Sequence, residues 1–183
     1  NDVDHSFVRG DAENLDFIPD ESADVYLGSL VLHLTANPHK LIQEAKRVLK
    51  KGCCLGFTVL GKLENNSIFK IVHDAFDKNG IDLPHKSSGG LPLNDRESLI
   101  QITQENGLEV VYAWKELLTF DVFEEKGFIK VLGQPRIAKI MNELDSETKA
   151  KVEQDMKNTL DQTKSQHLPL QAEVLFVIAK KPS

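Results

Sequence analysis

Residues 23–60 read ADVYLGSLVLHLTANPHKLIQEAKRVLKKGCCLGFTVL, and this stretch decides the fold. Residues 23–31 are largely apolar on both faces, which is typical of a strand buried inside a parallel sheet. Residues 38–50 repeat apolar side chains with the period of a helix, and residues 55–60 return to a short apolar run. The stretch therefore predicts a strand, a helix and a second strand, which is the unit from which parallel sheets are built.

The predicted helix carries signals at both of its ends. Asn37 is a favourable N-cap, and Pro38 occupies the first helical position, where no backbone N–H is needed. Gly52 is expected to end the helix, with Lys50 and Lys51 beside the negative end of its dipole. The helix is therefore expected to stop just before the second strand.

The rest of the chain continues this alternation. Strands are expected at residues 6–9, 108–114 and 171–180, and helices at 67–78, from Asn94 to residue 106, and over most of 128–164. Asn94 and Glu97 have the spacing of a capping box, and residues 81–93 are expected to form a loop. Alternating strands and helices predict an α/β fold with a largely parallel sheet, and the helices before the last strand suggest an inserted cap.

The composition limits the classes of partner. A length of 183 residues suits one domain. The chain has 22 Lys and Arg against 28 Asp and Glu, a formal net charge of −6, so it lacks the basic character expected of a protein that binds phosphate backbones. No apolar run approaches the roughly 18 residues needed to span a bilayer. Nucleic acid and membrane are therefore not expected as partners, and the oligomeric state stays open.

The cysteines and histidines indicate neither a disulfide nor a metal site. Cys53 and Cys54 are the only cysteines, and adjacent cysteines rarely pair because the bridge strains the intervening peptide. Two free thiols favour a reducing compartment, so a cytoplasmic location is expected. The six histidines and two cysteines show no metal-ligand spacing, so no metal is expected.

Three ordered groups of residues carry a resemblance to a known family. They are GDAENLDF at 10–17 with DESADV at 20–25, SLVLHL at 29–34 with Asn37-Pro38, and EAKRVLKKG at 44–52. In this order and spacing they resemble the type 11 family of small-molecule methyltransferases, which use S-adenosylmethionine (SAM). The resemblance implies a Rossmann-like class I methyltransferase sheet with an antiparallel last strand. It also implies a helical cap or substrate region at about residues 115–166.

The resemblance assigns SAM as the cofactor and methyl transfer to a small-molecule acceptor as the activity. Asp11 matches the acidic residue that accepts a hydrogen bond from the adenine amino group, and the N–H of Ala12 matches the donor to an adenine ring nitrogen. The alternative is that Asp11 merely begins a turn after Gly10. The other cofactor-binding candidates at the expected strand ends are Glu13, Gly28, Ser29 and Leu30.

Three further residues are candidates for contact with the methyl acceptor. His33 matches a common family histidine that orients the substrate or acts as a base, since an unperturbed imidazole titrates near pH 6.5. The alternative is a packed histidine with one hydrogen bond. Glu64 and Asn65 follow the carboxyl end of a predicted strand, where ligands bind α/β sheets, although Asn66 or Ser67 could equally cap the next helix.

The sequence also departs from the family pattern. Residues 50–53 read KKGC where the family has Lys-Pro-Gly-Gly, and no Gly-x-Gly occurs in the chain. The glycine loop lets the backbone approach the cofactor closely, so residues 1–183 are interpreted as one methyltransferase-like domain that is incomplete at its N-terminal end. The chain alone is then expected to bind SAM weakly. The alternatives are an inactive methyltransferase-like binding module and a protein of this fold with non-methylating chemistry.

Overall fold

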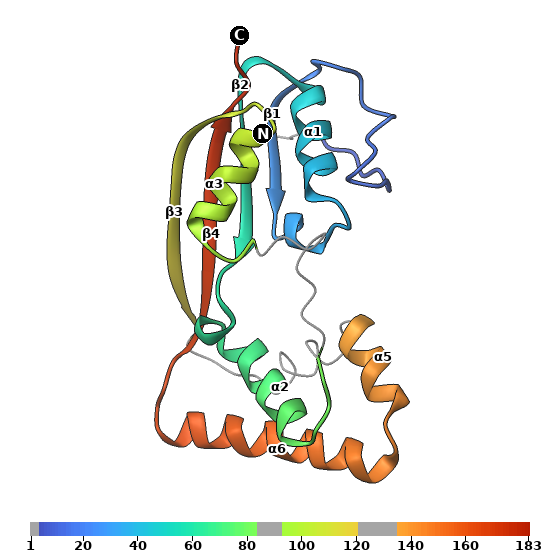
Figure 1. Ribbon diagram of the computed structural model, residues 1–183, viewed down its shortest axis with the longest axis vertical. Helices are drawn as coiled ribbons and strands as arrows, with labels where there is room; N and C mark the ends of the chain where they lie inside the picture. Colours follow the sequence, from blue (N-terminus) through green and yellow to red (C-terminus); the bar gives the residue numbers. More distant parts are fainter. Residues whose placement is uncertain (1–3, 84–92, 121–134) are drawn as a thin grey trace. The chain divides into compact units, whose positions relative to one another are not determined.

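The structure is a computed structural model that describes residues 4–83, 93–120 and 135–183 (Figure 1). The chain divides into two compact units. Unit 1 comprises residues 1–59, 86–115 and 175–183, and unit 2 comprises residues 60–85 and 116–174. Each unit is described by itself. Within the described residues, no helix is both long enough and apolar enough to cross a membrane.

The strands form one four-stranded sheet in the order β1-β2-β4-β3, with bounds β1 (Ala23–Ser29), β2 (Leu49–Leu60), β3 (Glu109–Phe120) and β4 (Leu170–Lys180). β1 and β2 are parallel. β4 runs antiparallel to β2, because the Gly52 N–H donates to the Lys181 carbonyl at 2.9 Å while the Gly61 N–H donates to the Glu173 carbonyl at 2.8 Å. The predicted α/β fold with an antiparallel last strand is confirmed.

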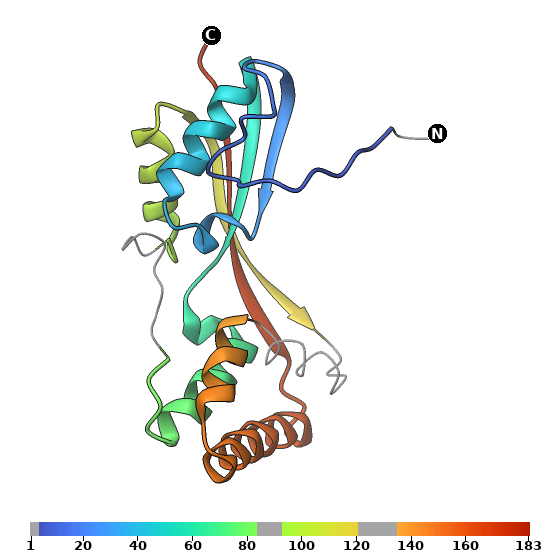
Figure 2. The same cartoon turned by 90° about the vertical axis from the view of Figure 1, so that its right-hand side faces the viewer.

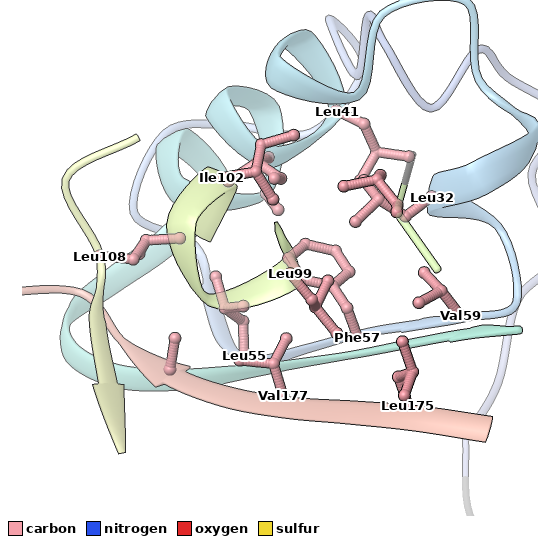
Figure 3. Close-up of a cluster of buried hydrophobic side chains, with 14 of the residues drawn as sticks. Leu32, Leu41, Leu55, Phe57, Val59, Leu99, Ile102, Leu108, Leu175 and Val177 are labelled. Carbon is pink, nitrogen blue, oxygen red and sulfur yellow. The ribbon is translucent and has the colours of Figure 1, made fainter. Parts of the chain in front are cut away.

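In unit 1, helices α1 (Pro38–Val48) and α3 (Arg96–Glu105) lie on the same face of the sheet (Figures 1 and 2). Their apolar faces and the strands build a single core, in which Phe57 is 1% exposed. Figure 3 shows this ring surrounded by leucine, isoleucine and valine side chains from both helices and from β2 and β4. The helical period predicted for residues 38–50 therefore reflects burial against the sheet.

The opposite face of the sheet in unit 1 is more exposed. Among the described residues of unit 1, α-helices cover only one face (Figure 2). On β1, Val25 is 62% exposed and Leu27 is 78% exposed. Gly28, on the face of β1 that packs against Phe57, is buried. The strand is therefore apolar on both faces, as the sequence predicts, but buries only one of them.

The difference between the two faces predicts unequal effects of two glycine substitutions on the free energy of unfolding. An alanine Cβ at Gly28 would lie 2.8 Å from Cδ1 of the buried Phe57, whereas one at Gly56 would lie 3.2 Å from the end of the exposed Leu27 side chain. Gly28→Ala should lower the free energy of unfolding by about 1–3 kcal/mol, because a packed ring cannot move aside without strain. Gly56→Ala should change it by less than about 0.5 kcal/mol. Chemical denaturation measures both, and equal effects would contradict this account of the faces.

Unit 2 contains helices α2 (Ser67–Lys78), α5 (Pro135–Glu143) and α6 (Ser146–Ser165) and the short 3-10 helix η2 (Leu63–Asn65). These helices confirm those expected at 67–78 and within 128–164, and their shared core includes Phe76, Ile137, Met141, Val152, Met156 and Leu160. Asp155 on α6 accepts hydrogen bonds from Lys78 and Asn79 at the end of α2. Residues 121–134 of the expected cap and residues 84–92 of the expected loop lie outside the described residues.

The prediction of a strand at residues 6–9 is wrong. Residues 4–10 have no strand pairing and are exposed, and the Phe7 side chain is 93% exposed. A strand requires a partner for its backbone N–H and C=O groups, and the described residues offer this segment none. An apolar run predicts a strand only where a neighbouring strand is present to pair with it.

Two helix boundaries also differ from the prediction. Helix α1 ends at Val48, and residues 50 and 51 already belong to β2, so Gly52 is not its terminator. Gly52 has φ of +75° and instead sits where β2 pairs with Lys181. Helix α3 is capped by Asp95 rather than Asn94, because the Asp95 carboxylate accepts the Ser98 N–H at 2.8 Å. The buried Leu49 continues directly into the sheet, which overrides the glycine signal.

Candidate cofactor and substrate site

Two residues of α1 fix the segment that contains the cofactor candidates. Glu44 accepts the Leu15 N–H at 2.7 Å. Arg47 donates to the carbonyls of Leu15 at 2.7 Å and Ile18 at 2.9 Å, and it also pairs with Glu44 at 2.9 Å. Leu15 itself is buried. The segment 11–18 is therefore attached to α1 through its backbone, independently of most of its own side chains.

The Glu44–Arg47 pair is ionised at neutral pH. Hydrogen bonding from Arg47 lowers the pKa of Glu44, burial opposes this shift, and the Leu15 N–H reinforces it. The same pairing, together with Asp20, raises the pKa of Arg47. Both residues lie in the segment at 44–52 that carries the resemblance, but sequence reasoning gave them no role. Their spacing of three residues on a helix was the available signal.

Asp11 forms the turn that was the alternative to adenine binding. Its Oδ1 accepts the Glu13 N–H at 2.9 Å, and its carbonyl accepts the Asn14 N–H at 3.0 Å. Within the described residues no hydrogen bond is formed by its second carboxylate oxygen, and the side chain is exposed. Ala12 packs against the unit 1 core. The turn and an adenine contact are therefore compatible, because they use different carboxylate oxygens.

Glu13 has a structural partner. Its Oε1 accepts the N–H of Asn37 at 2.9 Å, and Asn37 caps α1 by accepting the Lys40 N–H. This bond joins the segment of Asp11 and Ala12 to the residues that follow the carboxyl end of β1. The cofactor candidates of unit 1 are thereby brought to one edge of the sheet.

The carboxyl end of β1 is tightly bound to β2. Ser29 Oγ lies 3.2 Å from Thr58 Oγ1, and the Leu30 N–H donates to the Thr58 carbonyl at 3.0 Å. Leu30 has φ of +52°, a left-handed conformation that costs energy for a branched residue. Such conformations cluster at ligand sites, but the Leu30 N–H is already used, and Gly28 is required by the packing of Phe57. A cofactor at this end of β1 would therefore contact side chains, because the Leu30 N–H is already bonded to Thr58.

His33 lies in the 3-10 helix η1 (Leu32–Leu34), directly after β1. Its Nδ1 is buried and forms no hydrogen bond within the described residues. Burial lowers the pKa of the imidazole, so the ring is neutral at pH 7. The alternative of a packed histidine satisfied by a hydrogen bond therefore does not account for Nδ1, and a buried polar atom without a partner is uncommon outside functional sites.

In unit 2, Glu64 and Asn65 lie in η2, after the end of β2. Glu64 is exposed, while Asn65 Nδ2 donates to Glu173 Oε2 at 2.9 Å. The alternative that Asn66 caps α2 holds for its position, because Asn66 is the N-cap residue and its carbonyl accepts the Lys70 N–H. Neither side chain forms a capping hydrogen bond, since Asn66 Nδ2 donates to the Lys62 carbonyl and Ser67 Oγ accepts the Gln171 N–H. Sequence reasoning missed Glu173, although an acidic residue in an apolar strand was the signal.

The structure describes one open depression in unit 1 away from these candidates. It has a volume of about 530 Å³ and is lined by Gln43, Lys46, Arg47, Glu105, Asn106, Gly107 and Lys181. Its cations already have partners: Lys46 donates to the Asn106 carbonyl and Lys181 to Glu21. Within the described residues no cluster of three or more His, Cys, Asp or Glu could hold a metal ion. Cys53 and Cys54 are free thiols.

Residues 1–57 match the family described as the methyltransferase domain, a segment that includes the 11–18 turn, β1, η1 and α1. Residues 1–57 therefore carry the sequence pattern of a methyltransferase domain. The match covers the residues that gave the resemblance, and these residues carry the cofactor candidates of unit 1. No protein with a curated description matches this chain in sequence.

Several solved structures of similar fold are described as methyltransferases. A Bacillus halodurans protein assigned as a methyltransferase is 20% identical, with a TM-score of 0.57 and coverage of 97% of this chain and 78% of its own. An Anabaena variabilis protein assigned to an antibiotic biosynthesis pathway is 18% identical, with a TM-score of 0.56 and coverage of 92% and 71%. At these identities the likeness shows the fold, and it does not identify an acceptor.

A third structure is a Haloferax volcanii protein assigned as a methyltransferase, in complex with the Trm112 methyltransferase activator. It is 19% identical, with a TM-score of 0.50, and the match covers 97% of this chain and 62% of that protein. The chain described here thus spans less than two thirds of that protein.

Proposed function

We propose that this protein is a methyltransferase that transfers the methyl group of SAM to a small-molecule acceptor, with the cofactor held at the carboxyl edge of the unit 1 sheet. The observation that carries the proposal is the Glu13–Asn37 hydrogen bond of 2.9 Å. It joins the turn of Asp11 and Ala12 to the residues after β1, so the adenine candidates and His33 belong to one edge. Ligands of open α/β sheets bind at this edge.

The residues present fit SAM. Asp11 retains a carboxylate oxygen that can accept the adenine amino group, and Ala12 is small enough to leave room for the ring. Bound SAM would supply an electrophilic methyl group on a sulfonium. The protein would hold the acceptor in line with that methyl group, and such orientation lowers a barrier by roughly 7–11 kcal/mol. Glu44 and Arg47 would maintain the turn from outside the site.

His33 would remove a proton from the acceptor or orient it. Its burial keeps the imidazole pKa below the ordinary 6.5, so the base form dominates at neutral pH. The rate of methyl transfer by the natural full-length protein should therefore be constant above about pH 6.5 and fall as the pH drops through the lowered pKa. A His33→Gln variant should lose about a hundredfold in kcat and lose the acidic limb of the pH profile.

His39→Gln is the matched control for this experiment. The His39 ring lies on α1, with Nδ1 3.0 Å from Asn106 Nδ2, and has no part in the proposed site. It should keep the parent's rate and pH profile. If His33→Gln also keeps both, His33 is a packing residue and the base assignment is wrong.

The alternative function is a methyltransferase-like module that binds without activity, which the missing Gly-x-Gly favours. A SAM titration and a methyl-transfer assay on the natural full-length protein separate the two. SAM binding without transfer to any acceptor in a deproteinised cell extract would support the binding module.

A further inference from the structure

Glu173 is a buried carboxylate that accepts hydrogen bonds from the loop following β2. It lies in β4 and is 5% exposed. Its Oε1 accepts the Lys62 N–H at 3.1 Å, and its Oε2 accepts Asn65 Nδ2 at 2.9 Å. These partners are 111 and 108 residues away in the sequence. A carboxylate in this place therefore connects the last strand to the loop that follows β2.

The loop is shaped around this side chain. The Gly61 N–H donates to the Glu173 carbonyl at 2.8 Å, and a Cβ at Gly61 would lie 2.2 Å from Glu173 Oε1. Only glycine allows this approach. Asn66, at the end of the loop, is 3% exposed and forms a bridge with Ala172, the neighbour of Glu173. The two ends of the 61–66 loop therefore lie against Glu173 and its neighbour Ala172.

Core packing alone does not explain an acidic residue here. Burying a carboxylate is costly, and an apolar side chain would fill the same space in the strand without that cost. The carboxylate is offset by hydrogen bonds that an apolar side chain cannot accept, and each of them fixes part of the loop. One contribution of the carboxylate is therefore to the conformation of residues 61–66.

We propose that Glu173 is a positioning residue for the methyl acceptor, holding the 61–66 loop so that Glu64 and Asn65 face the acceptor. The inference rests on the proposed function, because it takes these two residues as acceptor contacts. Glu173 does not touch the acceptor itself. It acts on acceptor binding through Asn65 and the Lys62 backbone, and it has no part in SAM binding.

The test exchanges donor and acceptor in the hydrogen bond between the side chains of Asn65 and Glu173. Glu173→Gln keeps an acceptor for the Lys62 N–H but places an amide donor against the Asn65 amide. Asn65→Asp places one carboxylate against another. With both substitutions, the amide at 173 donates to the carboxylate at 65, so the bond is restored with its direction exchanged. Glu153→Gln, on the exposed surface of α6, is the matched control.

All variants are made in the natural full-length protein and assayed with tritiated SAM and a deproteinised cell extract as the source of small-molecule acceptors. Each single variant should raise the extract concentration for half-maximal transfer about tenfold. The SAM dissociation constant should stay unchanged by calorimetry. The double variant should return most of the way to the parent, and the control should match the parent.

The other outcomes are decisive. Single variants that unfold at lower temperature but keep the parent's half-saturation would show a purely structural role and overturn the inference alone. Impaired single variants without rescue in the double variant would also overturn it, because Asn65 would then act independently of Glu173. A parent that transfers no methyl group overturns both the inference and the proposed function. If Glu173→Gln does not fold, Asn65→Asp and the double variant still give the comparison.

Discussion

Asp11→Ala in the natural full-length protein should weaken SAM binding by about 1–3 kcal/mol, or roughly 5- to 150-fold in the dissociation constant. The substitution removes the carboxylate oxygen proposed to accept the adenine amino group. It also removes the acceptor of the Glu13 N–H, which is 2.9 Å away. Calorimetric titration with SAM measures the combined effect.

Asp11→Asn separates these two contributions. Its side-chain oxygen can still accept the Glu13 N–H and keep the turn, while its amide group presents a donor to the adenine amino group. SAM affinity should therefore fall almost as far as for the alanine variant, with little change in the free energy of unfolding. Asp16→Ala, an exposed carboxylate of the same segment, should bind like the parent. Parent-like affinity of both Asp11 variants would leave Asp11 as a turn residue only.

The order of elements in this fold could be predicted from the sequence because burial imposes a period. The helix expected at 67–78 is α2 with the same bounds, and the apolar run at 23–31 contains β1. The expected strand at 171–180 differs from β4 by one residue. In each case the side chains that set the period are those that pack in a core, so pattern and structure report the same contacts.

The boundaries and the supporting contacts could not be predicted in this way. Gly52 carries a helix-stop signal, yet its position is set by pairing with Lys181, far away in the sequence. Glu173 stands out in the sequence as an acidic residue in an apolar strand, but its partners are identifiable only once β4 lies beside the loop after β2. Glu44 and Arg47 were visible as a pair on a helix, but not as the residues that hold the Leu15 backbone. Such roles depend on long-range contacts that local patterns do not encode.

β1 is an edge strand with exposed apolar side chains on one face. It lies at the edge of the sheet, and within the described residues it pairs only with β2. Val25 and Leu27 are 62% and 78% exposed on the uncovered face, and Phe7 is 93% exposed nearby in the sequence. A parallel sheet is normally covered on both faces, and an exposed apolar edge invites aggregation.

We propose that further polypeptide of the natural protein covers this edge and face. Leu27→Ala tests the proposal in two settings. In the isolated 183-residue chain the side chain is mostly exposed, so the substitution should change the free energy of unfolding by less than about 0.5 kcal/mol. In a longer natural form, where Leu27 would be covered, it should cost about 2–5 kcal/mol. Leu168→Ala, at an exposed position in unit 2, should cost little in both.

The same proposal predicts the largest functional difference. The isolated chain should bind SAM weakly or not at all and should transfer no methyl group, because the glycine loop that lets a backbone approach the cofactor is absent from its sequence. The longer natural form should bind SAM and transfer its methyl group to an acceptor in a deproteinised cell extract. Tritiated SAM measures transfer by both forms side by side. Sustained turnover by the 183-residue chain alone would contradict the proposal, since residues 1–183 would then form a complete site despite the bare edge of β1.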